Sequence, residues 1–398
     1  FMSAKDQSVF AKSALMGTRS GRVILKQILL RETGYKQFNK YKQKTEQEFR
    51  EFTTRFVVSL HEKIASDTNP SGTLKKFIEE IGSSEFALDE HNINDIKSRL
   101  SKPEVLSDRL GRILNSNFVK MTFPVFTALF DGASDYLKEN VPTDTRNSII
   151  DGHIIAIDLS EPMDRIIDKD EDLEYLDDYK LMSPYILEIA REKISRGGDS
   201  VLKTFEEGFK DARIGQYIDS KLKSKPESIS DEGMIGCYKK YRAIMGSAGR
   251  NMALNHRPLG DIYQLGMAKA GECVGCGNEI EDAVKSGSIK IPSWPLFYSL
   301  IVGDIKKGFE LTMKKSKIYS DDAKIALQML PQGYPIMPFL EFLFVTISHY
   351  NEYWYNEMVR RNLFPYFEKN TNVLVDYQKN IKALENKDKE KRVFSGSS

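Results

Sequence analysis

The segment SWPLFYSLIVG, residues Ser293 to Gly303, is the most apolar and aromatic short run in an otherwise polar chain. A helix that spans a membrane needs about 20 apolar residues, so this segment is too short to cross a bilayer. The longer apolar run from Ile336 to Tyr355 is interrupted by Glu341, His349 and Glu352. We therefore expect no membrane-spanning segment. The segment is instead a buried element or the wall of a binding groove.

The rest of the chain has the composition of a globular protein with an uneven distribution of charge. It has 398 residues, 40% of them hydrophobic and 29% charged, and a net charge of +1. Residues 1–50 carry eleven Lys and Arg against four Asp and Glu, whereas residues 151–190 carry twelve acidic residues against three basic ones. Such opposite ends suit an anionic ligand or self-association through complementary surfaces. Two solvated surfaces of opposite sign are the simpler alternative.

Helical periodicity dominates the sequence. Apolar residues recur at helical spacing in several stretches, for example Val201, Phe205, Phe209 and Ala212. His153 to Leu159 (HIIAIDL) is the best candidate for a strand, and no regular alternation of strands and helices is present. The stretch from Ala270 to Pro295 is rich in Gly, Ser and Pro, which predicts a loop or hinge before a second lobe. We expect a mostly α-helical fold.

The motifs of common catalytic and metal sites are missing. There is no GxxxxGK[ST], HExxH or GxSxG sequence, and the five histidines are scattered singly. The sequence therefore predicts a protein that is not an enzyme and that has no cofactor and no metal site. One alternative is a small zinc-dependent module around Cys273 and Cys276, for which Cys237 and His256 are the only nearby additional ligands. Their spacing matches no common zinc pattern.

A basic helix is predicted from Gly236 to Leu254. On a helical wheel, Tyr238, Tyr241, Met245, Ala248 and Met252 form an apolar stripe. A second stripe about 100° away carries Lys239, Arg242, Gly246 and Arg250. Arginine forks bind phosphate oxygens in a bidentate manner, so this face suits phosphates. A solvated basic face is the alternative.

Residues 294–303 resemble a segment of a known protein family. Residues 294–303 (WPLFYSLIVG) are similar to YPLLWSYAMG, a central segment of nucleoproteins of non-segmented negative-strand RNA viruses in the paramyxovirus branch. The identical residues are Pro295, Leu296, Ser299 and Gly303, and aromatic residues stand at 294 and 298. Residues 319–329 resemble the family's YFDPAYFRLGQEM, and residues 261–266 resemble its IQIVG. The length of the chain is closer to rhabdovirus nucleoproteins and their plant-virus relatives.

This resemblance implies two helical lobes with RNA in a basic cleft between them, and terminal arms that exchange with neighbouring protomers. The corresponding domains are an N-terminal arm (1–30), an N-terminal lobe (31–289), a C-terminal lobe (290–372) and a C-terminal arm (373–398). Trp294 takes the place of the aromatic residue beside the RNA, and Gln264 that of an RNA-contacting glutamine. Aromatic side chains in such sites stack on bases.

The resulting hypothesis is a viral nucleoprotein that binds single-stranded genomic RNA independently of its sequence and assembles into a helical nucleocapsid. The predicted RNA-binding residues are Lys239, Lys240, Arg242, Arg250, Arg257, Gln264, Trp294, Lys306, Lys307, Lys314 and Lys315. Expected partners are viral RNA, further copies of the chain, and the viral phosphoprotein and polymerase, with no membrane. The expected location is the virion nucleocapsid and the host cytoplasm or nucleus. A helical interaction scaffold or effector that binds no nucleic acid is the other alternative.

Overall fold

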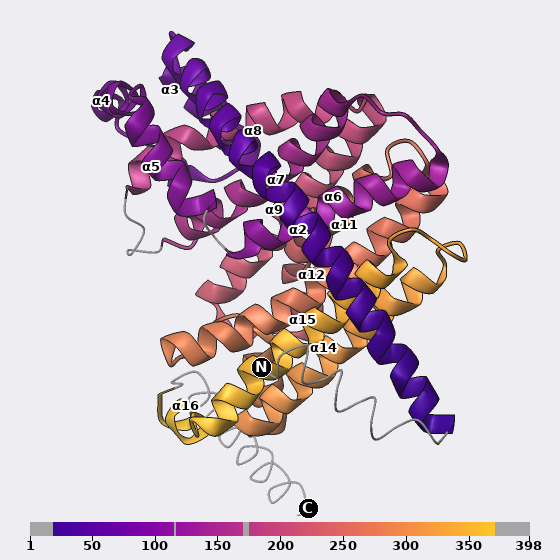
Figure 1. Ribbon diagram of the computed structural model, residues 1–398. Coiled ribbons are helices and arrows are strands. Elements are labelled where there is room, and N and C mark those ends of the chain that lie inside the picture. The colour runs from indigo at the N-terminus through magenta and orange to yellow at the C-terminus, as the bar shows by residue number, and fades with distance from the viewer. Residues whose placement is uncertain (1–18, 115–116, 170–174, 371–398) are drawn as a thin grey trace, which may run out of the picture. The chain divides into compact units, whose positions relative to one another are not determined.

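The computed structural model describes residues 19–114, 117–169 and 175–370, and every regular element in these ranges is a helix (Figure 1). The prediction of a mostly α-helical protein is therefore confirmed. The predicted C-terminal arm and most of the N-terminal arm lie outside the described residues. None of the described helices is long and apolar enough to cross a membrane.

The larger helices follow one another along the chain with short connections. In the first part of the chain they are α2 (Arg19–Ser66), α3 (Pro70–Ile81), α4 (Glu90–Leu100), α5 (Pro103–Leu114), α6 (Asn117–Leu137), α7 (Thr143–Ile167), α8 (Leu176–Ser195) and α9 (Asp199–Ser224). In the second part they are α10 (Asp231–Cys237), α11 (Lys239–Met252), α12 (Arg257–Ser286), α13 (Trp294–Val302), α14 (Ile305–Gln328), α15 (Met337–Arg360) and α16 (Phe364–Asn370).

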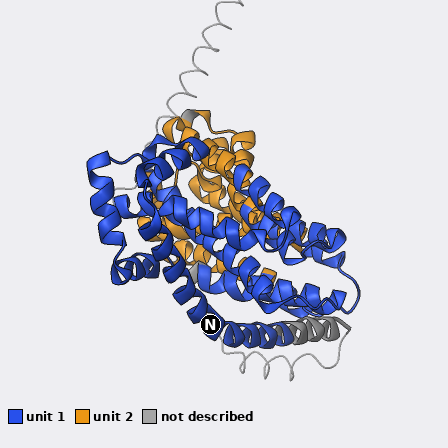
Figure 2. Cartoon of the chain, turned by 90° about the horizontal axis from the view of Figure 1, so that it is seen from above, with its two compact units in different colours: residues 1–210, 244–267, 324–343 blue, residues 211–243, 268–323, 344–398 orange. Residues whose placement is uncertain are grey.

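The helices form two compact units, each assembled from three stretches of sequence (Figure 2). Unit 1 consists of residues 1–210, 244–267 and 324–343, and unit 2 of residues 211–243, 268–323 and 344–398. The lobe boundaries expected at residues 30, 289 and 372 stay predictions.

In unit 1 the central helix is α7, which is buried on almost all sides. Its residues from Ser148 to Leu159 are nearly all buried, and its most extensive partner is α8. Gly152 permits the close approach of α8, because a Cβ atom there would lie 2.6 Å from Cγ1 of Ile194. The strand expected at His153–Leu159 is wrong for the same reason: a helix that is buried all round shows no helical period in its hydrophobic residues.

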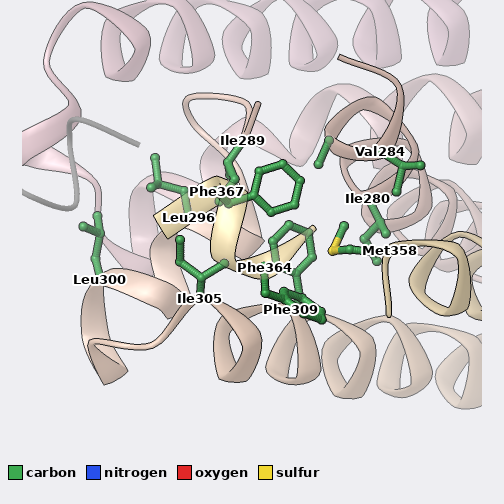
Figure 3. Close-up of a cluster of buried hydrophobic side chains, with 11 residues drawn as sticks. Ile280, Val284, Ile289, Leu296, Leu300, Ile305, Phe309, Met358, Phe364 and Phe367 are labelled. Atoms are coloured by element: carbon green, nitrogen blue, oxygen red, sulfur yellow. The ribbon is translucent and has the colours of Figure 1, made fainter. Parts of the chain in front are cut away.

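In unit 2 the apolar segment SWPLFYSLIVG, residues 293–303, contains α13. Ser293 caps it, with its Oγ accepting a hydrogen bond from the Leu296 N–H at 3.2 Å. Gly303 ends it in the left-handed conformation, with φ at 67°. Leu296 and Leu300 face a buried cluster with side chains of α12, α14, α15 and α16 (Figure 3). The segment is thus a short core helix with well-formed ends.

The loop expected over Ala270–Pro295 is wrong for most of its length, because α12 continues to Ser286. The glycines here serve close packing rather than turning. A Cβ atom on Gly275 would lie 2.9 Å from the Tyr241 ring, and one on Gly277 would lie 2.0 Å from Oδ1 of Asn351. The Asn351 side chain is fixed, since its amide donates to the Cys273 carbonyl at 2.9 Å and to Ser316 Oγ at 2.6 Å.

This packing predicts the effect of one added methyl group. Gly277→Ala should lower the free energy of unfolding by about 1–3 kcal/mol, because the buried Asn351 must move and lose its hydrogen bonds. Gly233→Ala is the matched control, since its Cβ would meet the flexible end of Leu222 at 3.0 Å and Ser230 Oγ at 3.3 Å. Urea denaturation followed by circular dichroism measures both variants. Equal stability of the two would contradict the packing described for α12.

Candidate functional site

Trp294, the residue expected beside RNA, lies in the core of unit 2. Its side chain is fully buried, it stacks on Tyr298 with ring centroids 5.3 Å apart, and it packs edge-on against Tyr238. Lys315 Nζ lies 4.6 Å from the centre of the indole ring. The structure thus brings Trp294 and Lys315 together, but as a packed cation–π pair. No face of the indole is open to a base.

Several of the predicted basic residues are neutralised by neighbouring acids. Lys240 is buried, and its Nζ lies 3.6 Å from Asp219. Arg242 pairs with Glu272 at 3.7 Å. Arg250 pairs with Asp261 and donates to Gln264 Oε1 at 2.8 Å. The remaining basic residues of the set are wholly or partly exposed: Lys239, Arg257, Lys306, Lys307 and Lys314. The basic stripe is therefore largely a structural feature of α11 and its neighbours.

The three cysteines are buried thiols. Cys273 Sγ lies 3.4 Å from Ser316 Oγ, and Cys276 Sγ accepts a hydrogen bond from Tyr238 at 3.7 Å. Burial raises the pKa of Cys276 well above its usual range, so this thiol stays protonated and is a poor zinc ligand. No three or more His, Cys, Asp or Glu side chains are grouped to hold a metal in the described part of the chain. The zinc alternative is not supported.

Glu279 is a buried carboxyl that holds the start of α13. Its Oε2 accepts a hydrogen bond from the Trp294 backbone N–H at 3.0 Å. Burial raises the pKa of Glu279 to about 8, although the hydrogen bonds from Trp294 and Tyr238 act in the opposite direction. Half of these carboxyls are therefore neutral near pH 8. The hydrogen bond from the Trp294 N–H to Glu279 thus stabilises the fold of unit 2.

The buried face of α7 in unit 1 carries three ionisable side chains with different surroundings. Asp151 is paired with Arg55 at 3.2 Å and with Lys193 at 3.4 Å. His153 accepts a hydrogen bond at Nε2 from the Asn251 amide at 3.0 Å. Burial lowers the pKa of His153 to about 3, so the ring is neutral. These two groups are satisfied by their neighbours.

Asp158, the third ionisable group, has no such partners. Its side chain is 5% exposed, and neither carboxylate oxygen has a hydrogen-bond partner. Burial, assisted by the charge of Glu161, raises the pKa of Asp158 well above its usual range. Pro162 lies one turn further along α7 and has no N–H to donate to the Asp158 carbonyl. Among the described side chains, Asp158 alone has two buried oxygens left unpaired.

Such a group is unusual because an unpaired buried polar atom costs about 1–3 kcal/mol. Strongly perturbed carboxyls concentrate at functional sites. Asp158 is therefore the candidate functional residue of unit 1, and α7 is the element that positions it. The sequence alone did not indicate Asp158, because residues 153–159 (HIIAIDL) were interpreted as a strand. The available signal was a single acidic residue within a run of isoleucines.

No protein-family model and no curated protein matches the sequence. Solved structures do match it. A decaprenyl diphosphate synthase from Rhodobacter capsulatus superposes with a TM-score of 0.52 at 11% identity, over 73% of this chain and 98% of that chain. The chain shares its fold with this synthase. A polyprenyl synthase from Caulobacter crescentus CB15, solved with calcium and isoprenyl diphosphate, gives a TM-score of 0.51 at 12% identity, over 70% and 97% of the two chains.

This finding corrects the nucleoprotein hypothesis. The neighbours in structure are polyprenyl synthases rather than viral nucleoproteins, so the predicted function as an RNA-binding nucleoprotein, the viral partners, the nucleocapsid assembly and the virion location are wrong. The prediction of a non-enzymatic protein is wrong on the same ground, because the proteins that share the fold are named as synthases. Residues 294–303 resemble the nucleoprotein segment because α13 is packed in the core. Many buried helices need apolar and aromatic residues of this kind.

The fold also raises the question of a metal, since the Caulobacter structure contains calcium. Divalent cations of this kind take six or more oxygen ligands, mostly carboxylates. On α7, Asp151 is already paired with two cations, and Asp158 has a raised pKa that disfavours the charged form. The described residues therefore do not fit a divalent metal. The acidic run at 170–174 lies outside them.

The raised pKa of Glu279 predicts the pH dependence of stability in unit 2. The unfolded glutamate has a pKa of 4.5, and the folded one about 8. The folded state therefore binds more protons between these values, and stability should fall as the pH rises from about 5 to about 8. Glu279→Gln keeps an acceptor for the Trp294 N–H and should make this dependence weaker.

Urea denaturation at several pH values measures the Glu279 effect. Glu310→Gln, on the exposed side of α14, is the control and should keep the wild-type profile. A Glu279→Gln profile that still falls with the wild-type slope would show that another group causes the dependence.

Proposed function

We propose that this chain is an enzyme that acts on an isoprenyl diphosphate, and that Asp158 contacts the substrate. The observation that carries the proposal is the unpaired, buried carboxyl on α7. The fold supports it, because two synthases of polyprenyl or decaprenyl diphosphates share it over nearly their whole length. A residue that destabilises the apo fold is retained where a ligand supplies the missing partner.

The chemistry of Asp158 follows from its protonation state. Its raised pKa favours the neutral carboxyl, which carries one O–H donor and a carbonyl acceptor. The donor can form a hydrogen bond to an oxygen of the diphosphate. Buried residues such as Ile154, Ile155 and Leu159 exclude water from α7, which strengthens that hydrogen bond. Contact between Asp158 and the diphosphate stabilises the negative charge that develops on the diphosphate as it leaves.

Access to Asp158 requires movement, because its side chain is closed to solvent. The helix is weakest at this point, since Pro162 leaves the Asp158 carbonyl without its intrahelical hydrogen bond. We therefore expect substrate entry to displace the side chains that cover Asp158, with α7 bending near Pro162. The proposal assigns no step to a metal, because the described residues do not fit one.

Replacement of Asp158 tests the proposal by two effects of opposite direction. Asp158→Leu removes an unpaired polar group and should raise the free energy of unfolding by about 1–3 kcal/mol. It should also weaken the binding of geranylgeranyl diphosphate at least tenfold. Asp158→Asn keeps an N–H donor and should bind with intermediate affinity. Isothermal titration calorimetry measures binding, and urea denaturation measures stability.

Asp151→Asn is the matched control on the same helix. It breaks the pairs with Arg55 and Lys193, so it should lower stability and leave the affinity nearly unchanged. Wild-type affinity in Asp158→Leu would remove Asp158 from the substrate site. Failure of the wild-type chain to bind any isoprenyl diphosphate would overturn the proposed function as a whole.

A further inference from the structure

Unit 1 contains a second polar site, a pocket of 350 Å³ that opens to solvent. It is formed by α2, the C-terminal end of α6, the α6–α7 connection and the first turn of α7. Its volume suits a small organic ligand. The pocket belongs to neither the Asp158 site nor the residues predicted from sequence.

One part of the pocket wall is a closed ionic network. Asp131 accepts hydrogen bonds from Lys44 Nζ at 2.7 Å and from Arg146 Nε at 2.7 Å. Arg146 also lies 3.6 Å from Glu48. Although burial opposes it, hydrogen bonds from Arg146 and Lys44 hold the pKa of Asp131 below its usual range. These two cations are therefore already engaged with carboxylates and have little attraction left for an anion.

The other part of the wall is electronegative. Asp135 and Glu139 line the pocket and form no ion pair with a described residue. Ser134 contributes a buried Oγ that has no hydrogen-bond partner. The C-terminal end of α6, which closes at Leu137, adds the negative end of its helix dipole. Lys40 is the one lining cation that has no carboxylate partner among the described residues.

Tyr41 lines this pocket beside its charged groups. Burial and the charges of Asp131 and Asp135 raise its pKa to about 12, and Arg146 offsets only part of that effect. Tyr41, Phe130 and Val141 also give the pocket apolar surface. The wall therefore combines carboxylates and hydroxyls with an aliphatic and aromatic lining.

We propose that this pocket binds an aliphatic amine, whose ammonium group lies between Asp135 and Glu139 and whose methylene groups lie against Tyr41, Phe130 and Val141. Primary ammonium groups carry three donors and no acceptor, which matches a wall rich in acceptors. A phosphate, by contrast, would meet two unpaired carboxylates and only Lys40 as an available cation.

Isothermal titration calorimetry with 1,5-diaminopentane tests the proposal, with inorganic phosphate as the opposite probe. The wild-type chain should bind the diamine and not the phosphate. The double variant Asp135→Asn, Glu139→Gln should lose at least tenfold in affinity for the diamine, with circular dichroism unchanged because both residues are exposed. Lys40→Gln is the matched control and should bind the diamine as tightly as the wild type or more tightly.

Two results would overturn the proposal. Absence of diamine binding, or equal binding by the double variant, would remove the amine site. Binding of phosphate that is lost in Lys40→Gln would show that the pocket selects anions.

Discussion

Burial of α7 on nearly all sides is the constraint on which unit 1 depends. A helix in that position must find a partner for every polar side chain it carries, because water is excluded. Asp151 meets the requirement with Arg55 and Lys193, and His153 meets it by remaining neutral and accepting from Asn251. Asp158 does not meet it. The contrast among three groups on one helix is what distinguishes Asp158 from an ordinary core residue.

In unit 2, Glu279 and Asn351 are buried polar residues that form hydrogen bonds within the fold. Glu279 has a raised pKa, yet its oxygen accepts from the Trp294 backbone, so its role is to fix the start of α13. Asn351 likewise binds the Cys273 carbonyl and Ser316. A perturbed pKa alone would place Glu279 and Asp158 in one class. The hydrogen-bond partners separate them, because a group that is already bonded to the fold has no need of a ligand.

Local features of the fold were predictable from the sequence. Ser293 and Gly303 mark the two ends of α13, and the apolar stripe of Tyr238, Met245, Ala248 and Met252 is buried as expected. Long-range packing was not predictable. Gly275 and Gly277 favour a loop when considered alone, yet they lie inside α12, where the absence of a side chain lets Tyr241 and Asn351 approach closely. Asp158 was equally hidden, since no local pattern states whether a distant side chain will pair with it. Trp294 was predicted to contact RNA because the sequence does not show that Tyr298 and Lys315 pack against it.

The central claim is that the chain transforms an isoprenyl diphosphate, and turnover tests it most directly. The purified protein would be incubated with geranylgeranyl diphosphate and radiolabelled isopentenyl diphosphate, with and without Mg²⁺, and the organic-soluble products separated by chromatography. The account predicts labelled products longer than the substrate, and a yield that falls in Asp158→Leu without loss of folded protein. Absence of any labelled product from the wild-type chain under both conditions would contradict it.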